Sequence, residues 1–137
     1  MPTGERGATA GSPGDEGPTV PVLVVDDQAV FRDALSDVVR ATAGMKLVGD
    51  AASGEEAIAA VQALAPRLVV MDKRMPGIGG IEASRTIRAR FPDVVVVLVS
   101  VEEPATEVLD ASRAAAFLKK RELSPRALAE LWATYGA

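Results

Sequence analysis

Short apolar runs alternate with amphipathic segments along most of this chain. Each run has the length of a β-strand, and its apolar residues stand at consecutive positions rather than at every second one. Such runs lie at residues 22–25, 46–49, 68–71, 94–99 and 116–118. Strands that are apolar on both faces are typical of a parallel sheet covered by helices on both sides.

The segments between these runs carry the signals of helices. Apolar residues within 31–39 recur at the spacing of one helix face. Residues 53–56, Ser-Gly-Glu-Glu, fit a capping box and predict that a second helix begins there. A third helix is expected at about 80–90, and a short fourth one from Pro104. The pair Ser124-Pro125 has a capping residue before a proline, which predicts the start of a fifth helix.

Strands that alternate with helices in this way predict an α/β fold. Because the crossovers between parallel strands are right-handed, the compact solution is a doubly wound (βα)5 three-layer sandwich of the flavodoxin-like kind. The expected order of its parallel five-stranded sheet is 2-1-3-4-5, in which the order reverses between strands 1 and 3. Ligands of such sheets bind beyond the carboxyl ends of the strands, at that reversal.

The composition divides the chain into a tail and one domain. Residues 1–19 are rich in Gly, Pro, Ser and Thr, so we expect a disordered tail before a folded domain at 20–137. No apolar run approaches the ~20 residues that span a bilayer, so membrane insertion is not expected. The first residues lack the pattern of a secretion signal, and the chain has no cysteine. The expected location is therefore the cytoplasm.

Residue usage also restricts the chemistry. Histidine and cysteine are absent, which excludes zinc sites built from them and Ser-His-Asp triads. The net charge of −4 argues against direct binding to nucleic acid. The basic cluster Arg85, Arg88 and Arg90 is interpreted as a solvated helix face. Trp132 and Tyr135 lie on the apolar stripe of the last helix, and we expect them to be core or half-buried rather than anchors for a partner.

Polar residues follow the four strands that meet near the reversal. Asp26 and Asp27 come after the first strand, Asp72 after the third, Ser100 after the fourth and Lys120 after the fifth. Carboxylates that converge repel one another unless a cation neutralises them, and Mg²⁺ prefers such oxygen ligands. A lysine and a hydroxyl are suitable partners for phosphoryl oxygens. Each residue alone has a commoner explanation, as a cap, a turn or a surface group, but together they predict a phosphoryl-transfer site with a carboxylate nucleophile.

Four blocks of sequence, in this order, resemble the response-regulator receiver family of two-component signalling. They are Val22 to Asp27, Asp72 to Gly80, Ser100, and Phe117 to Lys120. The resemblance covers about residues 20–135. It implies a phosphorelay role, in which Asp72 accepts a phosphoryl group from a sensor histidine kinase or from a small donor such as acetyl phosphate.

The resemblance also implies a metal site. Asp27 and Asp72 would bind Mg²⁺ directly, together with the backbone carbonyl of Arg74. Asp26 would act mainly through a metal-bound water.

Further roles follow from the same resemblance. Lys120, rather than Lys119, takes the position of the site lysine, and Ser100 that of the hydroxyl that reaches toward the phosphoryl group. Phe117 takes the position of a switch aromatic, although as phenylalanine it lacks the hydroxyl of a tyrosine. Arg74 and Glu102 occupy positions that tune hydrolysis. We expect their opposite charges to approach across the mouth of the site and obstruct attacking water.

The sequence departs from the family pattern in several places, including Arg121, which stands where many relatives have a proline. The segment 100–120 is a residue or two shorter than usual and lacks the glycine before the fifth strand, so the fourth helix should be short or irregular. This segment belongs to the usual output surface of the family. Lys73 is an unusually polar neighbour of the acceptor, and it either reaches a phosphoryl oxygen or faces solvent.

Other functions stay open with less support. The main alternative is a receiver-like interaction module that signals without phosphorylation. A phosphoaspartyl hydrolase of the haloacid-dehalogenase type would need a second acid where Arg74 stands, and a dinucleotide-binding domain would need a glycine-rich turn where Asp26-Asp27-Gln28 stands. We therefore expect a receiver rather than an enzyme, one that catalyses only its own phosphorylation and dephosphorylation. Because no output domain follows, a stand-alone receiver would act through a downstream protein partner, and homodimerisation stays open.

Overall fold

The computed structural model describes residues 19–103 and 105–136, in which strands and helices alternate along the chain. The strands are β1 (Val20–Val25), β2 (Met45–Ala51), β3 (Leu68–Asp72), β4 (Val95–Ser100) and β5 (Ala116–Lys119). The helices are α1 (Ala29–Arg40), α2 (Gly54–Leu64), α3 (Gly79–Arg90), α4 (Thr106–Ser112) and α5 (Pro125–Tyr135), with a short 3-10 helix η2 (Lys120–Glu122) directly after β5.

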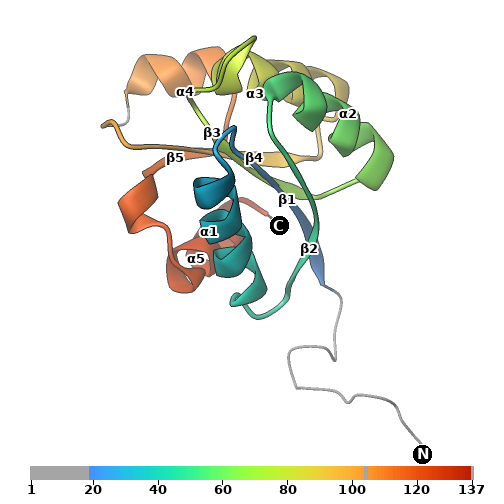
Figure 1. Ribbon diagram of the computed structural model, residues 1–137, viewed down its shortest axis with the longest axis vertical. Helices are drawn as coiled ribbons and strands as arrows, with labels where there is room; N and C mark the ends of the chain where they lie inside the picture. Colours follow the sequence, from blue (N-terminus) through green and yellow to red (C-terminus); the bar gives the residue numbers. More distant parts are fainter. Residues whose placement is uncertain (1–18, 104, 137) are drawn as a thin grey trace, which may run out of the picture.

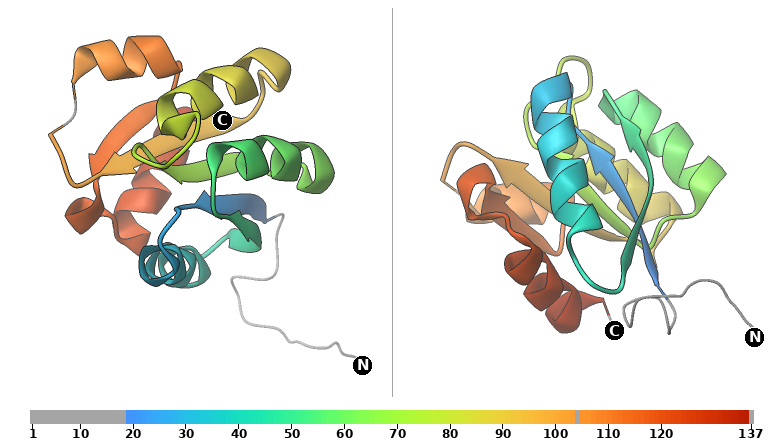
Figure 2. Two further views of the ribbon diagram at one scale, coloured as in Figure 1. Left: turned by 45° about the horizontal axis from the view of Figure 1, so that its top comes forward. Right: turned by 60° about the horizontal axis from the view of Figure 1, so that its bottom comes forward.

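The strands form one five-stranded sheet in the order β2-β1-β3-β4-β5, and each neighbouring pair is parallel. Helices α2, α3 and α4 cover one face of this sheet, and α1 and α5 cover the other (Figures 1 and 2). The predicted doubly wound fold and strand order are confirmed. The order reverses between β1 and β3, so the ends of these two strands border the crevice in which the site was expected.

Two apolar cores hold the three layers together. Alternate residues of each strand point to opposite faces of the sheet. Leu23, Val69 and Leu98 therefore contribute to the core beneath α2, α3 and α4. Their neighbours Val24 and Val70 contribute to the core beneath α1 and α5. Because the central strands are buried on both faces, the strand ends that carry the site residues are held in place.

Local sequence explains where two of the helices begin. The Ser53 hydroxyl accepts a hydrogen bond from the Glu56 backbone N–H at 3.1 Å, as the capping box predicts. The Glu56 carboxylate, however, reaches the backbone N–H of Ala52 rather than that of the capping residue. The Ser124 hydroxyl caps α5 in the same way, and Pro125 occupies its first turn.

Several surface interpretations need correction. Phe31 and Ala34 lie on the predicted apolar stripe of α1, yet both are exposed, and Leu35 and Val39 form its buried face. Arg88 is not merely solvated, because its guanidinium donates hydrogen bonds to the backbone oxygens of Pro92 and Val94. That guanidinium therefore satisfies carbonyls of the loop between α3 and β4.

The end of α5 also differs in part from the prediction. Trp132 is half-buried as expected, with the Arg67 guanidinium 5.3 Å from its ring centroid. Tyr135, expected on the same buried stripe, is exposed.

Helix α4 has only seven residues, so it is short, as the shortened segment predicts. The residue that follows it, Arg113, is its C-cap and has a φ of +58°, in the left-handed region that usually favours glycine. The buried hydroxyl of Ser84 on α3 donates to the backbone oxygen of Ser112 at 2.8 Å, which ties the end of α4 to α3.

Two predictions lie wholly or largely outside the described residues. They are the disordered tail, apart from Thr19, and the role of Pro104 as the start of the fourth helix. Within the part of the chain that is described, no helix is long and apolar enough to cross a membrane.

Gly80, in the first turn of α3, is packed directly against the end of β3. A Cβ at this position would overlap the backbone oxygen of Asp72 and lie 2.9 Å from the Cα of Lys73. Helix propensity alone would favour Gly80→Ala by about 1 kcal/mol. We expect the clash to prevail and the free energy of unfolding, measured by urea titration, to fall by about 1–3 kcal/mol. The exposed Ala89→Gly change on the same helix measures the propensity contribution alone, and a stabilised Gly80→Ala variant would contradict this packing.

Candidate functional site

Three carboxylates lie together at the carboxyl ends of β1 and β3. Asp26 and Asp27 follow β1, and Asp72 is the last residue of β3. One oxygen from each carboxylate lies within 4.8 Å of the others. Asp26 and Asp72 are buried, whereas Asp27 is partly exposed. Asp50, at the end of the outer strand β2, instead lies 3.8 Å from the Arg32 guanidinium and is not part of this cluster.

The ammonium group of Lys120 lies between two of these carboxylates. Its Nζ is 2.8 Å from Asp26 Oδ2 and 3.6 Å from Asp72 Oδ1. Lys120 opens η2 immediately after β5, and this turn directs its side chain back across the sheet end toward β1. The neighbouring Lys119 pairs with Glu103 instead. Of the two lysines, Lys120 is therefore the one that joins the acid cluster.

Phe31 is a neighbour of the site that periodicity did not identify. Its ring centroid is 4.0 Å from the Lys120 ammonium, close enough for a cation–π interaction. The aromatic ring is 39% exposed, so it covers the lysine at the surface rather than filling the core. Its position four residues after Asp27, in the first turn of α1, is the sequence signal that could have pointed to the site.

Asp26 is fully buried, and its charge is well supported. Its carboxylate accepts hydrogen bonds from Lys120 Nζ and from the backbone N–H of Gln28 at 3.0 Å. The Arg32 guanidinium donates to its backbone oxygen at 2.8 Å. These contacts fix the Asp26 side chain in place beside Asp72.

Asp72 is in a less favourable electrostatic environment. Burial and the charge of Asp26 raise the pKa of its carboxyl from 3.8 to about 6, with a smaller contribution from Asp27. Lys120 and the backbone N–H of Arg74 act in the opposite direction but do not offset these effects. One ammonium thus does not neutralise three acids. A hard divalent cation fits this donor set, because it would supply the missing positive charge among carboxylate oxygens.

A second cluster of charges lies at the edge of the site. Arg74 Nε and Arg74 Nη2 donate to the two oxygens of Glu102 at 3.0 and 2.7 Å, which makes a bidentate pair. Lys73 Nζ is also 2.7 Å from Glu102 Oε1. The hydrogen bonds from Arg74 and Lys73 lower the pKa of Glu102 to about 2, and Glu102 in turn raises the pKa of Arg74. The structure therefore brings together the two residues that were expected to approach, and adds Lys73 to them.

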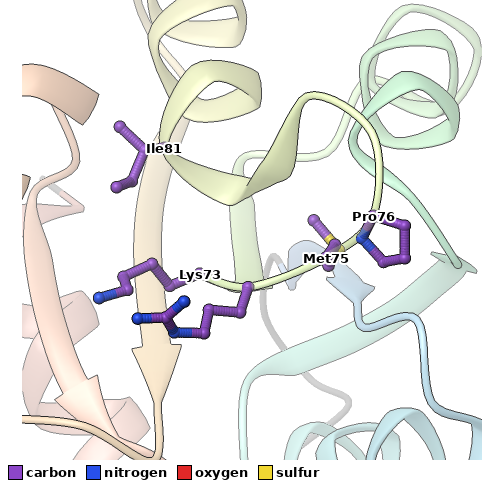
Figure 3. Close-up of a pocket in the computed structure, with 5 residues that line it drawn as sticks. Lys73, Met75, Pro76 and Ile81 are labelled. Atoms are coloured by element: carbon purple, nitrogen blue, oxygen red, sulfur yellow. The ribbon is translucent and has the colours of Figure 1, made fainter.

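The loop after β3 also borders a surface hollow of about 530 Å³. Its lining residues are Lys73, Arg74, Met75, Pro76 and Ile81. Lys73 extends from the strand end toward the β5 side, and Met75 and Pro76 lie on the opposite side of the loop (Figure 3). Two of the lining residues, Lys73 and Arg74, are the cations that pair with Glu102.

Comparison with known proteins agrees with this geometry. The family model of the response regulator receiver domain matches residues 22–131. The chain belongs to the response-regulator receiver family. Response regulator GacA of Pseudomonas protegens is 42% identical over 101 residues, which cover 72% of this chain and 47% of GacA. The response regulator domain of Thermotoga maritima CheB superposes with a TM-score of 0.75 at 32% identity, covering 87% of this chain and 98% of that domain.

The matches define which part of the relatives this receiver represents. The chain spans about half the length of the curated response regulators it matches. A protein-glutamate methylesterase/protein-glutamine glutaminase 2 of Photobacterium profundum is 39% identical over 106 residues, which are 75% of this chain but only 27% of that protein. The resemblance thus concerns a receiver domain in phosphorelay signalling, and the catalytic part of the methylesterase is a different domain.

Ser100 and Phe117 occupy buried positions in this receiver. The buried Ser100 hydroxyl accepts a hydrogen bond from the Glu102 backbone N–H at 3.1 Å. Among the described residues, no hydrogen bond joins this hydroxyl to Asp72. The Phe117 ring is 8% exposed and packs in the core beneath α3 and α4. Both side chains therefore border the second charge cluster, Ser100 through Glu102 and Phe117 through Lys73, whose Nζ is 5.7 Å from its ring centroid.

The raised pKa of Asp72 predicts how its charge affects stability. Because the carboxyl pKa is about 6 in the folded protein and 3.8 for an unperturbed aspartate, ionised Asp72 destabilises the metal-free fold above about pH 6. The penalty decreases as the pH falls and disappears below about pH 4, where both states are protonated. Asp72→Asn should therefore raise the free energy of unfolding near pH 7 by up to roughly 3 kcal/mol, with a gain that shrinks on acidification.

Urea titrations of the metal-free protein at several pH values measure this gain. Asp50→Asn serves as the control, since its carboxylate is 55% exposed and lies outside the cluster. A variant that is less stable than wild type near pH 7, or a gain independent of pH, would contradict the electrostatic account.

Proposed function

We propose that Asp72 is the phosphoacceptor of this receiver and takes its phosphoryl group from the phosphohistidine of a sensor histidine kinase. The observation that carries the proposal is the buried Asp72 carboxylate, which lies beside two further acids and the ammonium of Lys120. Receiver domains accept phosphoryl groups from histidine kinases. The residues at the ends of β1, β3 and β5 are those such a transfer requires: a nucleophile, a cation for phosphoryl oxygens and metal ligands.

The acid cluster is suited to Mg²⁺. We propose that Asp27, Asp72 and the backbone carbonyl of Arg74 hold the ion directly, with Asp26 acting through a bound water. When bound, the ion supplies positive charge that offsets the carboxylates and the phosphoryl oxygens. The fit rests on the close approach of three carboxylates and on the charge that Lys120 leaves uncompensated.

In the transfer, a carboxylate oxygen of Asp72 forms a bond to phosphorus while the bond from phosphorus to the histidine nitrogen breaks. The electron pair of the broken bond stays on the imidazole, and Asp72 becomes an acyl phosphate. Lys120 already faces Asp72, so its ammonium can neutralise a phosphoryl oxygen without a large movement. The Ser100 hydroxyl, whose oxygen accepts from Glu102, keeps its own proton free to donate to the phosphoryl group.

Exposed apolar side chains beside the site offer a surface for the kinase. Phe31 and Val101 are exposed and line a groove together with Lys120. This groove of about 410 Å³, with mainly apolar lining, runs between α1 and the segment after β5. A docked kinase would bury this patch and bring its phosphohistidine to Asp72. We propose that phosphorylation then alters contacts with a downstream protein partner.

A receiver-like module that signals without phosphorylation is the second candidate. Two observations favour it: Phe117, in the position of the switch aromatic, is already buried, and α4 is short. Both features concern the output side of the domain and leave the acid cluster intact. They therefore bear on whether the output requires phosphorylation, not on whether Asp72 can be phosphorylated.

Phosphorylation is tested by intact-mass analysis after incubation with acetyl phosphate. With Mg²⁺ present, we expect a gain of one phosphoryl group in the wild-type protein, because Asp72 is the buried nucleophile of the cluster. We expect no gain in the Asp72→Asn variant or when Mg²⁺ is removed with a chelator. A wild-type protein that stays unmodified, or a modified Asp72→Asn variant, would refute the assignment.

Beryllofluoride, an analogue of the phosphoryl group, separates the two candidates in the same preparation. If signalling by the receiver depends on phosphorylation, adding beryllofluoride together with Mg²⁺ changes which proteins bind to the receiver or changes its oligomeric state. An unchanged partner set, with the mass gain still observed, supports the second candidate.

The Arg74–Glu102 pair is proposed to slow dephosphorylation by narrowing the path of water to Asp72. Arg74→Ala should shorten the half-life of the phosphorylated protein severalfold, because the bidentate pair at the edge of the site is lost. The half-life is measured by the decay of the phosphorylated mass after removal of the donor. Arg85→Ala, an exposed arginine on α3, is the control. An unchanged half-life in Arg74→Ala would exclude this role.

A further inference from the structure

Lys73 is a lysine with little access to solvent, directly after the acceptor Asp72. Its side chain is 14% exposed, and its ammonium has two close partners of different kinds. Glu102 Oε1 lies 2.7 Å from Nζ, and the Phe117 ring centroid lies 5.7 Å from it. The side chain extends toward the β5 side of the loop (Figure 3).

Arg74 and Lys73 share the same carboxylate but differ in burial. The Arg74 side chain is 68% exposed, so its pair with Glu102 is a surface contact. A lysine normally keeps its ammonium in water, and withdrawing it is unfavourable unless an anion or an aromatic face replaces the solvent. Lys73 has both. Of the two cations on Glu102, Lys73 is therefore the one whose position is determined by the interior of the domain.

Through these contacts Lys73 connects three segments that are distant in sequence. It is attached to β3 next to the acceptor, and Glu102 belongs to the loop after β4. The backbone N–H of Glu102 donates to the Ser100 hydroxyl, so the ion pair also fixes the loop around that hydroxyl. The aromatic partner, Phe117, belongs to β5.

We propose that Lys73 is a positioning residue that holds Phe117 inward and the Ser100–Glu102 loop against the site before any phosphoryl group is present. The contacts of Lys73 with Glu102 and Phe117 do not depend on the proposed function. Only the consequence of these contacts for signalling rests on the proposed function. If the proposed function holds, a lysine of the resting protein thus sets the inward position of the Phe117 ring. Phosphorylation of Asp72 would then act on a loop that is already in place.

Replacing Lys73 with methionine is the direct test, because methionine keeps the length of the side chain and removes its charge. The loop would then be held by the exposed Arg74–Glu102 pair alone, and Phe117 would lose its cation. A partly desolvated cation over an aromatic face shifts a local equilibrium by roughly fivefold, so the outward population of Phe117 should rise by about that factor.

The position of Phe117 can be measured with 4-fluorophenylalanine, since the chain has three phenylalanines and each ¹⁹F signal can be assigned by single Phe→Leu changes. A soluble paramagnetic chelate broadens the signals of rings that reach solvent. In the wild-type protein we expect the Phe117 signal to be protected. In Lys73→Met we expect its broadening to increase severalfold, and in Lys73→Arg, which retains a cation, we expect protection to return.

Lys119 provides a matched control. It lies two residues after Phe117 on the same face of β5, is also 14% exposed and pairs with Glu103 of the same loop. No contact between its ammonium and the Phe117 ring is present among the described residues. Lys119→Met should therefore leave the Phe117 signal protected. Arg74→Ala should do so as well, because the Lys73–Glu102 pair remains.

The experiment can refute the role of Lys73 without bearing on the phosphorylation of Asp72. If Lys73→Met, shown to be folded by its circular dichroism, leaves Phe117 as protected as in wild type, the proposal is wrong. Equal broadening of the Phe117 signal in Lys73→Met and Lys119→Met would also overturn the proposal, because the loss of any partly buried lysine would then expose the ring. All measurements use the metal-free, unphosphorylated chain, so their result is independent of whether Asp72 accepts a phosphoryl group.

Discussion

The close approach of three carboxylates at the ends of β1 and β3 is the constraint on which the rest of this site depends. Asp26 has no access to solvent, and its carboxylate is held by Lys120 and by the backbone of Gln28. Burial and the negative charge of Asp26, which the nearby cation does not offset, therefore raise the pKa of the Asp72 carboxyl. The same imbalance makes the cluster suited to a divalent cation and leaves Lys120 beside the group that would react.

The sheet prevents the carboxylates from relieving their repulsion by moving apart. Asp26 and Lys120 are 94 positions apart in sequence, yet they are hydrogen-bonded because β1 and β5 end at the same edge of a parallel sheet. Close packing on both faces of the sheet keeps the strand ends in register. Stability of the scaffold is thus what maintains an electrostatically unfavourable site, as is common where a protein performs chemistry.

A second set of charges, around Glu102, connects the loop after β3 to Phe117 on β5. Glu102 is shared by the exposed Arg74 and the partly buried Lys73, and its backbone holds the Ser100 hydroxyl. The two cations have different surroundings and hence different roles in our proposals. The exposed one lies where water would enter, whereas the partly buried one contacts the ring of Phe117. In these two proposals, a single carboxylate affects both the lifetime of a phosphoryl group and the position of the Phe117 ring.

The sequence by itself determined the strands, their order and the residues at their ends. Buried parallel strands require consecutive apolar residues, and helix caps act within a few positions, so both leave a local pattern. Only the tertiary structure decided which side chains meet: Phe31 at the Lys120 ammonium, Lys73 between Glu102 and Phe117, and Arg88 on the carbonyls of its loop. These partners depend on the register of distant elements and on side-chain rotamers, which no local pattern encodes. Periodicity placed Phe31 on the face toward the core, but α1 begins at the rim of the sheet, so that the ring covers the site instead.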